Sequence, residues 1–399
     1  AAATTYTRLQ YGKVIMPYIT LRALPNYHQV SFEELLTNSI DLKQFFYNKT
    51  PSNTRTHYVQ NVNKKLITSI NFDDMKKSLY HFIDLNQQFF NGTISSLSTM
   101  YDTFYIPKSS GGLRRIDAPN DELMRTLKDL KRLFEDKLLA IHHTCAYAYI
   151  PGRCPLDAIK RHQSNESKWF GKFDFNNFFG STTQEFLESQ LKQIFPFSEL
   201  LNDAQISGLF HQVLSLCFLN NCLPQGTPMS PMLTNIMMIP IDFHISKWLR
   251  SLDKHTFVYT RYADDMQISS RSPFNIGKVQ NLILDVLNSF HAPFRLNDEK
   301  TRYGSTSGSN WNLGLMLNSQ NEITIGYKRK KQLKIMLNNF LYDYSNGKFW
   351  DASEVRHLQG QLQYYLSIEP DYISYLVDRY SQIHNVKIYD TFSKILKSN

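Results

Sequence analysis

The chain has 399 residues, of which 42% are hydrophobic, enough for a large buried core that we expect to be divided among subdomains. Its formal net charge of +9 favours a polyanionic partner such as a nucleic acid. No apolar run is long enough to cross a membrane, and Arg8 and Lys13 interrupt any signal-like segment, so we expect no membrane partner. The four cysteines show no paired spacing, and free thiols fit a reducing cytoplasm, so we expect a cytoplasmic protein.

The N-terminal part is expected to be helical. Residues 1–90 carry no motif that assigns a role, but the spacing of Leu and Phe predicts helices over 31–47 and 73–90. Such an extension could contact RNA or a second copy of the chain. After Asn120, apolar residues recur at helical spacing and predict a long amphipathic helix, namely Leu123, Leu127, Leu130, Phe134 and Leu138.

One acid lies in an aromatic run at 172–179. The run predicts a buried strand, and Asp174 inside it would be costly to bury without a cation or hydrogen-bond partners. Further along, Pro and Gly in residues 223–235 predict a loop. Thr234 or Asn235 is expected to precede an apolar helix that runs to about Leu249.

Two adjacent acids mark the segment Tyr262-Ala263-Asp264-Asp265. Strand alternation on both sides, over 257–261 and 266–269, predicts a β-hairpin with the acids at its turn. Neighbouring like charges repel, so we expect a divalent cation there, and hard oxygen ligands suit Mg²⁺ or Mn²⁺. With Asp174 as a third carboxylate, the set predicts a two-metal phosphoryl-transfer site. A plain Asp-Asp turn is the alternative.

The C-terminal part is expected to be a helical tail. Asp351 with Glu354 three residues later predicts a helix start. An apolar stripe follows on that helix, at Val355, Leu358, Leu362 and Leu366. A basic run at 328–331, together with Lys334, opens the tail, and we prefer phosphate contact to a merely solvated charged face.

Several segments in order resemble one family. The ordered set is Asp174 with Phe179, then Pro224-Gln225-Gly226 with Ser230-Pro231 and Asn235, then Tyr262-Ala263-Asp264-Asp265. It resembles the palm of reverse transcriptases, in the bacterial lineage of group II intron, retron and defence-associated enzymes. Four further segments are similar to that lineage's fingers hairpin, Gly-Arg segment, lysine-bearing loop and primer-grip hairpin, at 106–119, 148–153, 296–301 and 312–315.

The resemblance implies the architecture. The fold class is α+β, a right-hand polymerase fold with fingers and palm, in which an antiparallel sheet packs on helices, and an α-helical thumb of three helices. The implied organisation is a helical N-terminal extension of unknown role at 1–90, fingers at 91–170, a palm with catalytic hairpin and primer grip at 171–325, and a helical thumb at 326–399.

The resemblance also implies the catalytic residues. Asp174, Asp264 and Asp265 would bind two Mg²⁺ ions, with Mn²⁺ as an alternative. The Phe175 carbonyl would add a backbone oxygen to this set. Lys300 would act as general acid for the leaving pyrophosphate, and its alternative interpretation is a solvated loop lysine.

The incoming dNTP is expected to contact a second set of residues. Lys108 and Arg114 would neutralise and position the triphosphate. Phe179 would lie under the sugar and exclude a 2′-hydroxyl, although a Phe is also an ordinary core residue. Gln225 and Gly226 would approach template and nucleotide, because a missing side chain lets the backbone come close.

The nucleic acid itself is expected to contact the palm, the primer grip and the start of the tail. The residues that we expect to make these contacts are Tyr262, Leu313, Gly314, Lys328, Arg329, Lys330 and Lys331. The implied partners are an RNA template, expected to be a noncoding RNA, a DNA product and dNTPs. A second copy of the chain or a partner defence protein is left open.

The biological setting is predicted from departures from the retron pattern. Residues 157–162 and Asn312-Leu313-Gly314 differ from the segments typical of retron enzymes, and no segment after the thumb would hold a mobility domain. We therefore expect an RNA-directed DNA polymerase of antiphage defence. The alternatives are untemplated or protein-primed DNA synthesis, a retron enzyme, and a non-catalytic RNA-binding scaffold, against which the intact acidic set argues.

Overall fold

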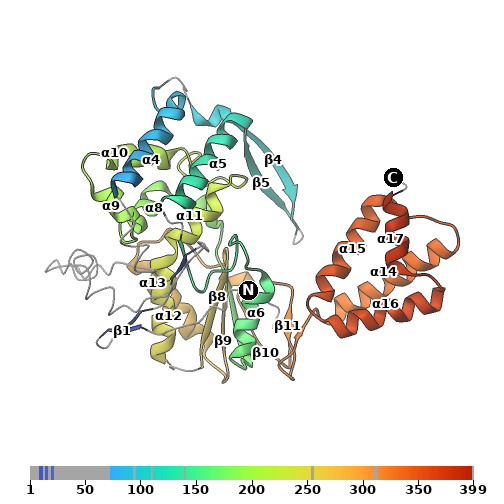
Figure 1. The fold of residues 1–399 in the computed structure, drawn as a ribbon. Coiled ribbons are helices and arrows are strands. Elements are labelled where there is room, and N and C mark those ends of the chain that lie inside the picture. The colour runs from blue at the N-terminus through green and yellow to red at the C-terminus, as the bar shows by residue number, and fades with distance from the viewer. Residues whose placement is uncertain are drawn as a thin grey trace. The chain divides into compact units, whose positions relative to one another are not determined.

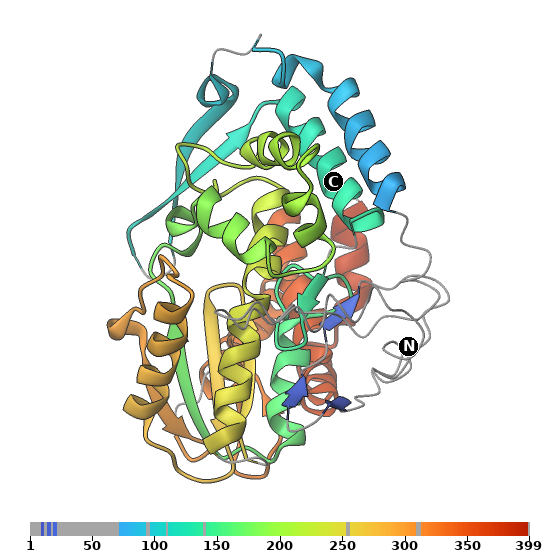
Figure 2. The ribbon, with the colours of Figure 1, turned by 90° about the vertical axis from the view of Figure 1, so that its left-hand side faces the viewer.

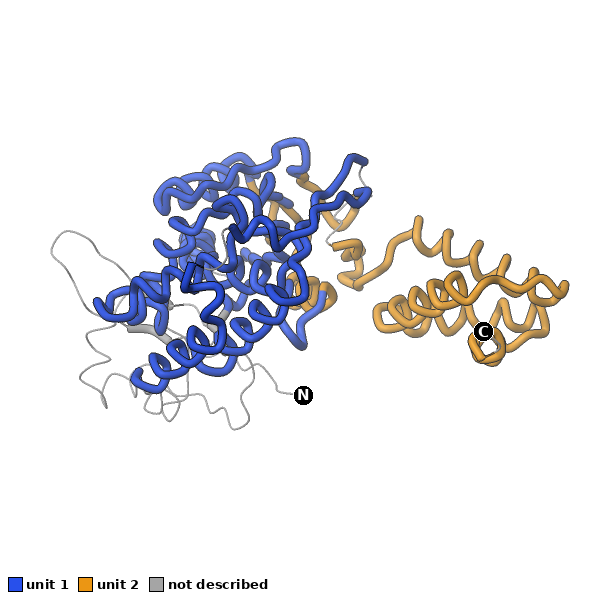
Figure 3. The backbone as a smooth tube through the Cα atoms, turned by 90° about the horizontal axis from the view of Figure 1, so that it is seen from above, with its two compact units in different colours: residues 1–154, 172–268, 275–301 blue, residues 155–171, 269–274, 302–399 orange. Residues whose placement is uncertain are grey.

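The computed structural model describes residues 9–11, 14–16, 19–21, 72–92, 96–108, 111–138, 141–252, 256–308 and 313–397. The chain divides into two compact units (Figure 3). Unit 1 comprises 1–154, 172–268 and 275–301, and unit 2 comprises 155–171, 269–274 and 302–399. No helix in the described ranges is long and apolar enough to cross a membrane. The helix predicted at 31–47 lies outside them.

The N-terminal extension contains strands as well as a helix. Antiparallel pairs join β1 (Leu9–Tyr11) to β2 (Val14–Met16) and β3 (Ile19–Leu21) to β6 (Ile141–His143). The helix predicted at 73–90 is confirmed as α4 (Phe72–Leu85), followed by a 3₁₀ turn at Gln87–Phe89. Its buried stripe consists of Met75, Leu79 and Phe82.

A long hairpin and a long helix follow. After a 3₁₀ turn at Leu97–Met100, β4 (Tyr101–Pro107) and β5 (Leu113–Pro119) pair antiparallel, which confirms the predicted hairpin. The Asn120 side chain caps α5 (Asp121–Asp136) by accepting a hydrogen bond from the Leu123 N–H at 3.0 Å. All five apolar residues of the predicted stripe are buried, although Leu138 lies two residues after the end of the helix. The helices α4 and α5 lie side by side (Figures 1 and 2).

A four-stranded sheet positions the acidic segments. Its order is β10-β7-β9-β8, and the strands are β7 (Trp169–Asp174), β8 (Val258–Tyr262), β9 (Asp265–Ser270) and β10 (Arg302–Ser305). Both β7 and β9 run from one unit into the other along the chain. Buried apolar side chains such as Phe173, Met266 and Ile268 anchor these strands in the core.

Most of the other elements of unit 1 are helices. They are α7 (Phe178–Ser181), α8 (Gln184–Leu191), α9 (Phe197–Asn202), α10 (Ser207–Ser215), α11 (Met229–Met237), α12 (Ile239–Leu252), α13 (Ile276–Ser289) and a 3₁₀ turn at Asp298–Lys300. The helix start predicted at Thr234 or Asn235 is wrong, because α11 already begins at Met229. There the Thr227 hydroxyl accepts from the Ser230 N–H at 3.3 Å, and a proline is tolerated in the first turn.

Unit 2 contains a small hairpin and helices. The hairpin joins β11 (Met316–Leu317) and β12 (Ile323–Thr324). The helices are α6 (Pro155–Ser164), α14 (Tyr327–Ser345), α15 (Ala352–Leu366), α16 (Pro370–His384) and α17 (Ile388–Lys397). The described tail therefore has four helices, not the three implied by the resemblance. The capping box of Asp351 and Glu354 is confirmed, and Val355, Leu358 and Leu362 are buried in an apolar cluster shared by all four helices.

Candidate active site

The three predicted acids lie at the ends of neighbouring strands in unit 1. The buried Asp174 ends β7, and the β8–β9 hairpin turns at Ala263 and Asp264 before Asp265 opens β9. Ala263 has a φ of 57°, which belongs to the left-handed turn region. The Phe175 N–H donates to the Asp264 carbonyl oxygen at 3.3 Å. Because β7 is next to β9, the sheet brings acids that are ninety residues apart in the sequence to one place.

Two lysines neutralise part of this acidic site. Lys300 Nζ lies 2.7 Å from Asp174 Oδ1, and Lys172 Nζ lies 2.9 Å from Asp265 Oδ1. Lys300 is thus an ion-pair partner within the site and more than a solvated loop lysine. Its part in proton transfer stays a proposal. Lys172 was not predicted as a site residue, although it lies two residues before Asp174 and so on the same face of β7.

Burial and mutual repulsion raise the pKa of two of the acids. Burial is the largest cause of the raised pKa of Asp264, and the charge of Asp174 adds to it. Burial likewise raises the pKa of Asp265 to about 6, although Lys172 acts in the opposite direction. A divalent cation relieves such repulsion, and carboxylate oxygens are the hard ligands that Mg²⁺ and Mn²⁺ prefer. The donor set therefore fits a divalent cation.

The β4–β5 hairpin supplies the predicted phosphate-binding cations. Arg114 lies on β5 and is exposed, and its charge acts on Asp264 by lowering the pKa of that carboxyl. Lys108 lies at the hairpin tip, where its N–H donates to the Gly112 carbonyl oxygen at 2.9 Å and its side chain is exposed. The charge of Arg114 thus acts on Asp264, whereas Lys108 is exposed at the tip of the hairpin.

Two aromatic rings meet beside the acids. Phe179 in α7 is half-buried, which is less than an ordinary core Phe, and its ring makes an edge contact with Tyr149 at 6.5 Å between centroids. Tyr149 is 53% exposed. Burial is the largest cause of its raised pKa, followed by the charges of Asp264 and Tyr262. Tyr149 lies in the segment 148–153 that resembles the Gly-Arg segment of the lineage, but the sequence pattern assigned this residue no role of its own.

Gln225 and Gly226 contact the protein's own backbone. The Asp117 N–H donates to the Gln225 carbonyl oxygen at 2.7 Å. Gly226 has a φ of 130°, and a Cβ there would lie 2.7 Å from the Asp117 carbonyl oxygen. The close approach expected toward a nucleotide is therefore, in this structure, an approach to strand β5. This packing explains the glycine without any ligand.

The predicted nucleic-acid contacts of unit 2 divide into two groups. Arg329 donates to the carbonyl oxygen of Gly314, next to Leu313, and Lys330 lies 2.5 Å from Glu369. These two cations are half-buried and engaged within the protein. The exposed cations at the start of α14 are Lys328, Lys331 and Lys334. Phosphate contact by Arg329 and Lys330 stays a prediction, and in this structure both side chains have partners within the protein. Asn312 lies outside the described residues.

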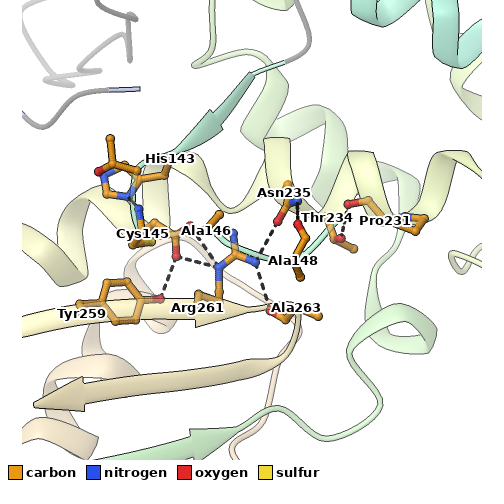
Figure 4. Close-up of polar contacts among 12 residues, drawn as sticks. His143, Cys145, Ala146, Ala148, Pro231, Thr234, Asn235, Tyr259, Arg261 and Ala263 are labelled. Atoms are coloured by element: carbon orange, nitrogen blue, oxygen red, sulfur yellow. Dashed lines mark hydrogen bonds and ion pairs between the residues drawn. The ribbon is translucent and has the colours of Figure 1, made fainter. Parts of the chain in front are cut away.

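A buried ionic network underlies the β8–β9 hairpin (Figure 4). Arg261 Nη2 lies 2.8 Å from Asp242 Oδ2, both side chains are 0% exposed, and the Tyr259 hydroxyl donates to Asp242 at 2.8 Å. Arg261 Nη1 also donates to the Ala263 carbonyl oxygen at 3.1 Å. The sequence carried a signal for this network that was not used, an Asp inside the apolar run 239–245, which needs a partner when buried.

Three side chains of this region offer ligand atoms within 4.8 Å of one another, those of His143, Cys145 and Asp242. However, Asp242 already accepts hydrogen bonds from Arg261 through both carboxylate oxygens, so a metal ion would face the guanidinium charge. His143 Nδ1 accepts from the Cys145 N–H at 3.3 Å, and burial raises the pKa of the Cys145 thiol, which disfavours the thiolate that binds metals. These residues fit a packed ionic core better than a metal centre.

Comparison with known proteins assigns the family. Residues 106–336, more than half of the chain, match the family described as reverse transcriptase (RNA-dependent DNA polymerase). The chain belongs to the reverse transcriptase family. It is an RNA-directed DNA polymerase with a right-hand polymerase fold, an RNA template and a DNA product. Reverse transcriptases in general use divalent metal ions, in agreement with the donor set of the acidic site.

Its relatives include bacterial retron enzymes. The chain is 27% identical to the Retron Ec83 reverse transcriptase of Escherichia coli, over 73% of this chain and 91% of the relative. It is 26% identical to the Retron Ec73 reverse transcriptase of Escherichia coli, over 69% of this chain and 86% of the relative. The chain is 26% identical to the Retron Mx65 reverse transcriptase of Myxococcus xanthus, over 70% of this chain and 64% of the relative. The predicted resemblance to the bacterial, retron-like lineage is confirmed.

Solved structures of telomerases are also similar. Apo telomerase from Candida tropicalis, truncated from the C-terminal domain, matches with a TM-score of 0.40 and 13% identity, over 62% of this chain and 60% of the telomerase chain. Telomerase from Candida albicans in complex with a TWJ fragment of telomeric RNA matches with a TM-score of 0.41 and 13% identity. The match covers 73% of this chain and 59% of the telomerase chain. The chain thus spans less than two thirds of either telomerase chain.

Proposed function

We propose that this polymerase synthesises DNA at Asp174, Asp264 and Asp265 with two Mg²⁺ ions, Mn²⁺ being the alternative, and copies a dedicated noncoding RNA in bacterial antiphage defence. One observation carries the catalytic part of the proposal. Three carboxylates from neighbouring strands gather in one site, and two of them have a raised pKa because of burial and like charge.

The residues of the site have distinct proposed roles. When bound, the two ions would activate the primer 3′-hydroxyl and stabilise the leaving pyrophosphate. The three Asp carboxylates, with the Phe175 carbonyl oxygen, supply hard oxygen ligands. Lys300 holds a proton on Nζ beside Asp174, at a position from which it can be given to the departing phosphate oxygen.

The nucleotide and the primer-template duplex are proposed to contact residues around this centre. Arg114 and Lys108 neutralise the triphosphate, and the ring of Phe179 excludes the ribose 2′-hydroxyl. Around the duplex, we propose contacts at Tyr262, at the primer-grip residues Leu313 and Gly314, and at the exposed cations of α14, Lys328 and Lys331. We also propose the division into an N-terminal extension at 1–90, fingers at 91–170, a palm at 171–325 and a thumb at 326–399.

The RNA part of the proposal is supported by the relatives, whose names describe retron reverse transcriptases. A retron enzyme therefore stays a candidate, although residues 157–162 depart from the retron pattern. Untemplated or protein-primed synthesis is the remaining catalytic alternative. A second copy of the chain or a defence protein is the further partner that we propose to look for.

The proposal is tested on protein purified from its native locus. We would sequence the nucleic acid that copurifies, before and after incubation with Mg²⁺ and dNTPs. The expected result is one small RNA and DNA complementary to it. DNA without complementary RNA would support untemplated or protein-primed synthesis and overturn the template assignment. Absence of new DNA would overturn the catalytic assignment and favour the scaffold.

A further inference from the structure

Tyr149 is an exposed aromatic residue in an unusual backbone conformation. Its φ is 60°, in the left-handed region that residues other than Gly, Asn and Asp rarely adopt, and its side chain is 53% exposed. A large ring held in this way at the surface gains little from core packing. Strained residues of this kind are found preferentially at functional sites.

Tyr149 lies close to Phe179, one of the residues that the proposed function assigns to the incoming nucleotide. Its ring meets that of Phe179 at 70° between ring planes. The charges of Asp264 and Arg114 both act on its hydroxyl, the first raising and the second lowering its pKa. Tyr149 also lines a cavity of about 250 Å³ with Pro228, so its ring is not closely packed on every side.

The buried network fixes the backbone on which Tyr149 stands. Arg261 Nη1 donates to Asn235 Oδ1 at 3.3 Å, and Asn235 Nδ2 donates to the Ala148 carbonyl oxygen at 2.8 Å, one residue before Tyr149 (Figure 4). The Tyr147 N–H, two residues before Tyr149, donates to the Arg261 carbonyl oxygen at 2.9 Å. Since Arg261 also holds Ala263, one network sets the positions of the catalytic turn and of Tyr149.

We infer that Tyr149 contacts the sugar of the incoming nucleotide, forming with Phe179 the wall that selects deoxyribose, and that Asn235 positions it. The inference rests on the proposed site of DNA synthesis. Two rings in edge contact make a corner, and a 2′-hydroxyl that entered this corner would be pressed against ring carbons, at a steric cost in binding. Phe179 alone would present one flat face to the sugar.

The test compares single-nucleotide incorporation by purified variants on a defined RNA template, with dNTPs and rNTPs. Tyr149→Ala should raise the KM for dNTP by roughly three- to tenfold and increase the relative use of rNTP, because the lost ring contact acts mainly on nucleotide binding. Tyr149→Phe keeps the ring and should change both quantities less than Tyr149→Ala. Tyr80→Ala, which removes an exposed tyrosine from α4, should change neither.

Asn235→Asp is the positioning variant, because it keeps an oxygen for Arg261 and loses the N–H that holds Ala148. It should shift the KM for dNTP and rNTP use in the same direction as Tyr149→Ala. The double variant should be no worse than the more affected single variant, because both act through one ring. Wild-type KM and sugar discrimination in Tyr149→Ala, or fully additive effects in the double variant, would overturn the inference.

The failure of this inference is distinguishable from failure of the proposed function. Asp264→Asn is measured in the same assay. If Asp264→Asn is inactive and Tyr149→Ala is unchanged, the proposed function stands and the inference about Tyr149 is wrong. If Asp264→Asn is fully active, the site of synthesis is elsewhere and the inference is overturned together with the proposed function.

Discussion

Two kinds of aspartate–cation pair in unit 1 differ in burial. Asp242 and Arg261 are both 0% exposed, and the guanidinium donates to both Asp242 oxygens and to the Ala263 carbonyl oxygen. In the acidic site, the Lys300 and Lys172 side chains are 54% and 30% exposed, and each lies against a single carboxylate oxygen. The buried pair is held from several sides, whereas the lysines approach the acids from solvent.

This difference in burial gives the two kinds of ion pair different roles. A closed guanidinium–carboxylate pair has fixed geometry and no access for water, so it can define the position of a backbone turn. A lysine ammonium on a flexible, partly exposed stem can leave its carboxylate when a divalent cation or a triphosphate arrives. A closed ion pair thus holds the backbone of the β8–β9 turn, whereas the lysine pairs of the acidic site are accessible from solvent.

The largest expected effect is on the buried pair. Asp242→Asn leaves the Arg261 guanidinium buried without its counter-charge, so unfolding should cost about 3–5 kcal/mol less than in the wild type. Urea denaturation followed by circular dichroism measures this. In the acidic site, Lys300→Met removes a cation that is 54% exposed, and it should lower the free energy of unfolding by less than Asp242→Asn does. Equal losses in both variants would contradict the distinction.

The next effect is a pH dependence of the free energy of unfolding, which arises from Asp265 in the acidic site. The folded pKa of Asp265 is about 6, above its ordinary value of 3.8, so the protonated acid stabilises the fold. This stabilisation is complete below about pH 4 and is lost as the pH rises through 6, amounting to at most about 3 kcal/mol. Asp265→Asn should remove it. The check is the difference in unfolding free energy between wild type and variant from pH 4 to 7 without divalent ions, and a constant difference would refute the assignment.

Metal binding should produce a smaller shift. At ten times its Kd, Mg²⁺ should stabilise the wild type by about 1.4 kcal/mol, and EDTA should reverse this. Asp264→Asn loses one carboxylate and should gain less at the same concentration. Thermal denaturation with and without Mg²⁺ measures both. An equal gain in the variant would mean that the ion binds outside the acidic site.

The smallest effect concerns the exposed and engaged lysines of α14. Lys331→Ala should lower the slope of log K against log salt for RNA binding by about 1, because one phosphate contact is lost. Lys330→Ala should leave the slope unchanged, since Lys330 is paired with Glu369. Filter binding over a range of salt concentrations decides this. Identical slopes for Lys331→Ala and wild type would exclude the phosphate contact.

The sequence predicted best where the pattern was local. The alternation around Tyr262 and Asp265 predicted a hairpin, and the apolar stripe after Asn120 predicted α5, because side-chain period and strand or helix geometry are directly linked. The three acids could be singled out because they lie in short segments where acids are unusual, and their catalytic role stays a proposal. Its assembly depends on the pairing order of β7 and β9, which no local pattern contains.

What was missed or wrong depends on contacts between distant segments. The role of Gly226 follows from its packing on Asp117, and Arg329 and Lys330 looked free because their partners lie 15 and 39 residues away. The start of α11 was misplaced because a Thr-Pro-Met-Ser-Pro segment suggests a loop. Asp242 inside an apolar run indicated a buried acid that needs a partner, but no local pattern identified Arg261, 19 residues away, as that partner.

The most direct test of the central claim is primer extension on a defined RNA template with dNTPs. Wild type and Asp264→Asn would be compared at equal concentration, with the folded fraction of each checked by circular dichroism. We expect the wild type to make complementary DNA only with a divalent ion, and the variant to be slower by at least about 10³-fold. Template-complementary DNA made by folded Asp264→Asn at the wild-type rate would contradict the account.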